Sequence, residues 1–179
     1  MNMVKNNFPD VCGCCRDYVL PEKQKTVYQW ELCSVIIPKK PSVDRKDGGH
    51  LILFPHRHIT KRSDLLPNEA IALMRSSMIV EQALYDVLLS LGIDLVNVNI
   101  GDYGNRKADE PFEKRHLHLH FYGRVRDDKN FSHKEYLCLP PKGSKYYDSI
   151  VPFSEKDRKL LRKRIEELDN ERRFDFGKN

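Results

Sequence analysis

The sequence predicts an antiparallel α+β fold, because its strand-like stretches are grouped and do not alternate regularly with helices. The main helix is expected over residues 67–91, where apolar residues recur at near-helical spacing between a proline at the start and Gly92 at the end. A second helix is expected over residues 154–173, opened by a Ser154-x-x-Asp157 pattern that resembles a capping box. At 179 residues, the chain is long enough to bury one core of its own.

The strands are expected in four stretches that are rich in β-branched, aromatic or alternating apolar residues. They are residues 26–37, which give one or two strands, and residues 51–54, 96–100 and 116–124. Irregular loops are expected over residues 38–49, 101–115 and 127–153, which are rich in polar, charged, proline or glycine residues. The second helix is basic, and its apolar stripe is expected to dock on the domain or on a partner subunit in preference to nucleic acid.

The composition and charge exclude several classes of protein. Hydrophobic residues make up 40% of the chain and charged residues 32%, as in ordinary globular proteins. No apolar run approaches the length that spans a bilayer, and residues 1–10 lack the apolar core of a signal peptide. We therefore expect a cytoplasmic protein, or a nuclear one if the source cell has a nucleus, with no membrane partner. The net charge of +5 suits an anionic small substrate and is too small to indicate nucleic acid binding.

The most informative motif is the run from His116 to Tyr122, in which three histidines alternate with apolar residues. On an extended strand, His116, His118 and His120 would line one face, while the apolar residues between them enter a core. Imidazole acts as a nucleophile, a general acid or base, or a metal ligand near neutral pH. The run therefore indicates a site that binds a metal or an anion. The alternative is a half-buried strand that carries histidines without a function.

The run resembles the His-φ-His-φ-His-φ-φ signature of the histidine triad superfamily, in which φ is apolar. Three other segments agree in order: residues 49–59 (GHLILFPHRHI), the predicted helix over 67–91 and the Asn99-Ile100-Gly101 tripeptide. The resemblance covers residues 10–125, which are expected to form a histidine triad domain. Residues 126–179 lie outside it and are expected to form an extension with the C-terminal amphipathic helix, packed on the same domain.

The resemblance implies a fold and an assembly. The expected fold is an antiparallel sheet of about five strands with the long helix packed on it. Members of the superfamily commonly form homodimers through that helix and an edge strand, so a homodimer is expected here.

The resemblance also implies a nucleotide substrate and a role for each histidine of the motif. The middle histidine, His118, would attack the α-phosphorus and form a nucleotidyl-histidine intermediate, which water then cleaves. His120 and His50 would contact the phosphate oxygens, where charge develops in the transition state, and Asn99 would donate an amide hydrogen bond near the phosphate or ribose. His116 is the first histidine of this catalytic triad. The third position is histidine, as in the hydrolase branches, and not the glutamine of the uridylyltransferase branch.

The sequence departs from the family pattern at two places. Hydrolase members usually carry Gly-Gln-Ser just before the triad, whereas Glu113 stands here where the serine is expected. Lys114 and Arg115 are the expected substitutes for the lost phosphate contacts, since their charge would strengthen hydrogen bonds to phosphate; Arg106 and Lys107 are further candidates. The ribose-binding acid of the family has no clear counterpart, and Asp44 and Asp47 are only candidates for it.

Cysteines near the N-terminus indicate a metal site. The chain has five cysteines, and an odd number in a chain without an export signal argues for thiols or metal ligands. Cys12 and Cys15 have the spacing that can hold one side of a tetrahedral zinc ion. By resemblance to members with a structural zinc, the four ligands would be Cys12, Cys15, His58 and His116. Cys14 and His56 are neighbours that could replace them, and ordinary thiols are the alternative.

These observations together predict a hydrolase that cleaves a P–O or P–N bond at the α-phosphate of a nucleotide. Dinucleoside polyphosphates and nucleoside phosphoramidates are the substrate classes that the resemblance implies. The alternative is a catalytically weak nucleotide-binding or interaction protein of the same fold, with an altered substrate loop. The intact triad favours the enzyme, and the changed residues 105–115 favour the alternative.

Overall fold

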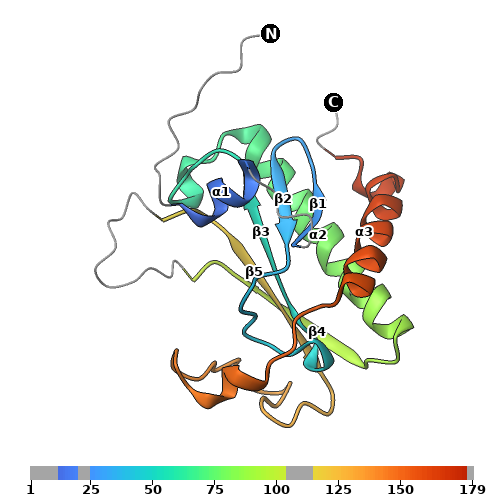
Figure 1. Cartoon of the computed structure of the whole chain (residues 1–179). Coiled ribbons are helices and arrows are strands. Elements are labelled where there is room, and N and C mark those ends of the chain that lie inside the picture. The colour runs from blue at the N-terminus through green and yellow to red at the C-terminus, as the bar shows by residue number, and fades with distance from the viewer. Residues whose placement is uncertain (1–11, 20–24, 104–114, 177–179) are drawn as a thin grey trace.

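The computed structural model describes residues 12–19, 25–103 and 115–176, in which five strands form one sheet (Figure 1). The strand order is β1-β2-β3-β5-β4, with β1 at Thr26–Gln29, β2 at Cys33–Ile36, β3 at His50–Pro55, β5 at Leu119–Val125 and β4 at Leu95–Gly101. All neighbouring strands run antiparallel. The expected α+β class with a five-stranded antiparallel sheet is confirmed.

Helix α2 (Pro67–Ser90) packs on one face of this sheet and closes the core. It begins where the carboxylate of Glu69 accepts the Leu66 backbone N–H at 2.8 Å, which satisfies one of the free donors of a helix start. It ends before Gly92, whose φ of 76° is left-handed and favours glycine. The helix predicted over residues 67–91 is therefore confirmed to within one residue.

Helix α3 (Glu155–Asp169) packs against α2 and against the edge strand β1 (Figure 1). Two of its arginines reach the edge of the sheet. Arg158 Nη1 donates to the Thr26 carbonyl at 3.1 Å, and Arg162 Nε donates to the Val27 carbonyl at 2.9 Å. The helix predicted over 154–173 ends at Asp169 and is followed by a separate 3-10 turn at Arg172–Phe174.

Residues 126–153 join β5 to α3 and are called here the 126–153 segment. It is irregular, as the sequence predicts, apart from a 3-10 turn at Lys145–Ser149. The guanidinium of Arg124, which is 2% exposed, fastens its first part to the sheet by donating to the carbonyls of Ser132 and Glu135. The division into a domain ending at residue 125 and an extension stays a prediction.

Two local features differ from the sequence expectations. The histidine strand begins at Leu119, so that His116 and His118 lie just ahead of the regular strand. A short helix, α1 (Gly13–Val19), carries the cysteine cluster, where no helix was expected. Among the described helices, none combines the length and the apolar character required to cross a membrane.

Candidate active site and metal centre

Three histidines meet on the face of the sheet opposite α2. His50 opens β3, and its neighbour across the strands is Tyr122, two residues beyond His120 on β5. The Nε2 atom of His50 lies 2.9 Å from the Nδ1 atom of His120. The ring centroids of His118 and His120 are 4.6 Å apart. The structure thus brings together three of the four histidines that the sequence predicts to be catalytic.

Hydrogen bonds assign the protons of His50 and His120. The backbone N–H of Ser42 donates to His50 Nδ1 at 3.1 Å, so the proton of the neutral His50 ring is on Nε2. That N–H donates to His120 Nδ1, which places the remaining His120 proton on Nε2. This atom is buried and has no partner among the described residues. A buried N–H without a partner is costly, and an oxygen of a bound anion would satisfy it.

The proton of His118 is assigned by a backbone carbonyl. His118 Nδ1 lies 2.7 Å from the His116 carbonyl oxygen, which can only accept, so Nδ1 carries the proton. The other ring nitrogen, Nε2, then has the lone pair. A neutral imidazole held in this tautomer is an effective nucleophile at neutral pH.

The paired histidines are held neutral. Burial lowers the pKa of His50, with a further lowering from the charges of His120 and His118. Burial also lowers the pKa of His120 to about 4, helped by His118 and Lys142 and opposed by Asp102. At pH 7, both rings therefore contribute no positive charge, and His120 offers its Nε2–H to a ligand.

The free energy of unfolding is expected to fall as the pH drops from about 6.5 to about 4. In this window the unfolded chain protonates His120 while the folded protein does not, so the unfolded state binds more protons. Above this window His120 is neutral in both states and has no effect. The full loss is about 3 kcal/mol, from 1.36 kcal/mol per pKa unit.

Urea unfolding of the wild type and of His120→Gln, between about pH 7.5 and pH 4, measures this effect. The difference between the two curves reports the titration of His120 together with its effect on the neighbouring His50, because the remaining titrating groups are common to both proteins. Two parallel curves would contradict the assignment of a lowered pKa to His120.

The predicted substrate contacts outside the triad are already engaged in other interactions. The Asn99 side-chain oxygen accepts from Arg124 Nη1 at 2.7 Å, and Arg115 forms an ion pair with Asp102 at 3.3 Å. Asp44 and Asp47 lie at the 3-10 turn Arg45–Asp47, where Asp44 accepts the Lys46 backbone N–H as its cap. Lys114, Arg106, Lys107 and Glu113 lie outside the described residues.

Aromatic residues that the sequence analysis did not single out border the histidines. The rings of His120 and Tyr122 are stacked, with an interplanar angle of 9°. Tyr103 is half exposed, and its ring centroid lies 5.6 Å from that of His120. The alternation along β5 could have pointed to Tyr122, which follows His120 on the same face.

The first triad histidine belongs to a different cluster. His116 Nε2 donates to the Pro55 carbonyl at 2.8 Å, so Nδ1 has the lone pair. This atom lies 3.3 Å from Cys12 Sγ and 3.5 Å from Cys15 Sγ. His58 Nδ1 lies 3.3 Å from Cys15 Sγ. The four residues predicted as zinc ligands therefore come together, with their ligand atoms all within 4.8 Å of one another.

The donor set fits a tetrahedral zinc ion. Zinc bonds of about 2.3 Å to sulfur and about 2.0–2.1 Å to nitrogen place neighbouring ligand atoms about 3.5 Å apart, close to the distances found here. The pKa of Cys12 is lowered by hydrogen bonds from Cys14 and Cys15, and the pKa of Cys15 is raised by its bond to Cys12. Two thiolates this close repel each other unless a cation lies between them.

The alternative ligands are less suited to the metal. His56 Nδ1 donates to the Glu31 carbonyl at 2.9 Å, and its Nε2 accepts from the Ser34 hydroxyl at 2.8 Å, so both nitrogens are engaged. Tyr18 of α1 stacks on this ring at 4.0 Å between centroids. His56 therefore helps to seat the helix that carries the cysteines. Cys14 is not part of the cluster that the described residues form.

The comparisons with known proteins bear on the fold. No protein-family model and no curated protein sequence matches the chain. Similar solved structures include a hypothetical histidine triad nucleotide-binding protein from Sulfolobus tokodaii strain 7, with 18% identity, a TM-score of 0.58, and coverage of 93% of this chain and 97% of the other. A Zn-bound histidine triad family protein from Mycobacterium smegmatis has 20% identity, a TM-score of 0.59 and coverage of 88% and 95%.

A uridylyltransferase is also similar, with 18% identity, a TM-score of 0.59 and coverage of 87% of this chain and 45% of the other. Likeness at such identities establishes architecture. The chain therefore has the histidine triad fold.

Proposed function

We propose that this chain is a histidine triad hydrolase, which cleaves a P–O or P–N bond at the α-phosphate of a nucleotide. The observation that best supports this is the lone pair of His118 Nε2, in a ring 4.6 Å from that of His120, whose buried Nε2–H has no partner among the described residues. The first atom can attack a phosphorus while the second donates to one of its oxygens. Dinucleoside polyphosphates and nucleoside phosphoramidates are the proposed substrates.

The proposed reaction has two displacement steps. His118 Nε2 attacks the α-phosphorus, a phosphorus–nitrogen bond forms, and the leaving group departs with the electron pair of the broken bond. A phosphate leaves as an anion, and an amine takes up a proton from solvent as it leaves. The His116 carbonyl accepts the Nδ1–H of His118 and so stabilises the charge that the ring acquires. Water then attacks the phosphorus and loses a proton to solvent, the phosphorus–nitrogen bond breaks with its electron pair returning to His118 Nε2, and the nucleoside monophosphate leaves with His118 neutral again. His120, held in its tautomer by His50, donates to the phosphate oxygen in both steps.

We propose further that Cys12, Cys15, His58 and His116 hold one structural zinc ion. Four protein ligands leave no open position for water, so the ion would fasten α1 to the start of the histidine strand. The Zn-bound protein from Mycobacterium smegmatis supports this proposal through its shared fold. His116 would then link the metal to the nucleophile, since its carbonyl holds His118.

A nucleotide panel tests the hydrolase proposal. Dinucleoside polyphosphates and aminoacyl nucleoside phosphoramidates are incubated with the purified protein, and release of nucleoside monophosphate is scored by chromatography. Turnover of at least one class is expected. Binding of nucleotides without turnover would favour the alternative, a nucleotide-binding protein with an altered substrate loop, and neither binding nor turnover would overturn both.

A homodimer remains part of the proposal. The outward face of α2 exposes Ile71, Met74 and Met78 at helical spacing, which is the kind of apolar stripe that a second copy covers. Analytical ultracentrifugation tests the homodimer: the wild type should be a dimer and Met74→Glu should weaken it, whereas a wild-type monomer would contradict the proposal.

The cytoplasmic or nuclear location stays a prediction from the sequence.

A further inference from the structure

Two of the three clustered histidines carry no positive charge, although the proposed substrate is an anion. His50 and His120 are neutral at pH 7 for the reasons given above. Arg115 and Arg62 both lie against the carboxylate of Asp102, at 3.3 Å and 3.8 Å. One carboxylate offsets only one of the two guanidinium charges, and a phosphate chain carries several negative charges, so a further cation near the cluster would strengthen its binding.

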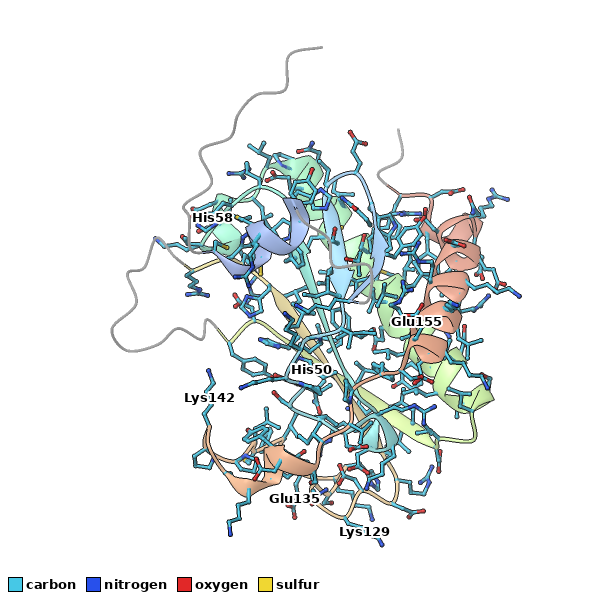
Figure 2. All side chains as sticks on the ribbon, in the orientation of Figure 1. His50, His58, Lys129, Glu135, Lys142 and Glu155 are labelled. Carbon is cyan, nitrogen blue, oxygen red and sulfur yellow. The ribbon has the colours of Figure 1, made fainter. Side chains whose placement is uncertain are left out.

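The 126–153 segment presents such a cation. Lys142 is exposed and forms no ion pair within the part of the chain that the structure describes. Figure 2 shows its side chain extending from this segment toward the side of the molecule where His50 lies. The charge of Lys142 is also among the causes that lower the pKa of His120, after burial and the charge of His118.

A tight turn holds Lys142 in this place. The backbone N–H of Ser144 donates to the Pro141 carbonyl at 3.1 Å, which puts Lys142 at the tip of a four-residue turn. Gly143 follows with a φ of 92°, a conformation that disfavours any other residue. The Tyr147 hydroxyl donates to the Pro140 carbonyl at 2.6 Å and supports the base of the turn.

The turn is also connected to the histidines. The Tyr146 hydroxyl donates to the Ser42 carbonyl at 3.1 Å, and the backbone N–H of the same serine donates to His50 Nδ1. Ser42 therefore both fixes the tautomer of His50 and holds the 3-10 turn Lys145–Ser149, which follows the turn that carries Lys142. These shared hydrogen bonds fix the position of the turn relative to the histidines.

We propose that Lys142 binds the phosphate groups of the substrate that extend beyond the phosphorus attacked by His118. The proposal rests on the proposed function and deepens it: the site would prefer substrates with two or more linked phosphates over those with a single phosphate. Lys142 is then a binding residue supplied from outside the stretch that resembles the histidine triad superfamily. Pro141, Gly143 and Tyr147 are positioning residues for it.

Equilibrium binding of inorganic pyrophosphate and inorganic phosphate to the full chain tests the proposal by titration calorimetry. Lys142→Ala is expected to weaken pyrophosphate binding about tenfold or more, since a charge-assisted hydrogen bond is lost, and phosphate binding by less. Lys142→Arg should restore most of the affinity. The matched control is Lys134→Ala, which removes another exposed lysine of the same segment and should change the affinity less than about twofold.

Two further outcomes would overturn the proposal. One is equal pyrophosphate affinity in Lys142→Ala and Lys134→Ala, and the other is a wild type that does not bind pyrophosphate. Tyr147→Phe tests whether the turn positions Lys142, because it removes the hydroxyl that supports the base of the turn. We expect a loss of pyrophosphate affinity smaller than that of Lys142→Ala, with an unchanged melting temperature. An unchanged affinity would show that the turn does not position Lys142. If the protein turns over nucleotides but its pyrophosphate affinity does not depend on Lys142, only this inference is rejected. If pyrophosphate binding depends on Lys142 but no nucleotide is turned over, only the hydrolase proposal is rejected.

Discussion

His118→Ala is expected to lower nucleotide turnover by roughly five orders of magnitude or more, because removal of a covalent nucleophile leaves no equivalent first step. Nucleotide binding should be retained, since the His120 N–H and the rest of the site stay in place. The ring of His118 is only half buried, so its loss should cost little stability. Steady-state kinetics with the best substrate of the panel, together with a binding titration, measures both effects.

The matched control is His133→Ala, which removes a histidine of the 126–153 segment whose Nδ1 donates to the Arg126 carbonyl. This variant should keep near wild-type turnover. Rapid acid quenching should trap a phosphorus–nitrogen adduct on His118 in the wild type. An adduct on another residue, or more than a few per cent of activity in His118→Ala, would remove His118 as the nucleophile.

Removal of zinc is expected to have the second large effect, on stability more than on chemistry. Protein purified without chelator should contain about one zinc ion per chain, held by the closed Cys12, Cys15, His58 and His116 set. Stripping the metal, or Cys12→Ser, should cost several kcal/mol and lower the melting temperature by about 6–12 °C for a loss of about 3 kcal/mol. Metal analysis and thermal unfolding provide the two readouts.

Two single substitutions separate the metal from general effects of cysteine loss. Cys138→Ser removes an exposed thiol far from the cluster in sequence and should change neither zinc content nor melting temperature. Cys14→Ser tests the choice of ligands, because this residue lies between the two proposed thiolates but outside the cluster. Full zinc content in Cys12→Ser together with its loss in Cys14→Ser would mean that the ligands were assigned wrongly.

Local patterns predicted the parts of this molecule that local forces determine. The α2 helix has a proline start, a glycine end and a periodic apolar face, and its bounds followed from these residues. The spacing of Cys12 and Cys15 likewise indicated a metal site. The two further ligands were placed only by the family resemblance, since His58 and His116 are separated from the cysteines by 43 and 101 residues.

Contacts between distant segments account for what the sequence could not predict. Alternation placed His116 beside His118 on one strand face, but its Nε2 donates to the Pro55 carbonyl and its Nδ1 meets the cysteines. The side-chain oxygen of Asn99 accepts from Arg124, a contact that the sequence did not indicate, while its role at the substrate stays a prediction. Lys142 belongs to an irregular segment without periodicity, so only the folded chain brings it toward the histidines.

The arginines of α3 leave the sheet with two unlike edges. At β1, Arg158 and Arg162 occupy carbonyl groups that an added strand would need. At the opposite edge, no described strand pairs with β4 beyond β5. A sheet that can be extended on one side only can join one other copy of itself edge to edge and then has no edge left for a third, because both free edges are used. Helix α3 would thus limit assembly to pairs and protect the protein from growing into filaments.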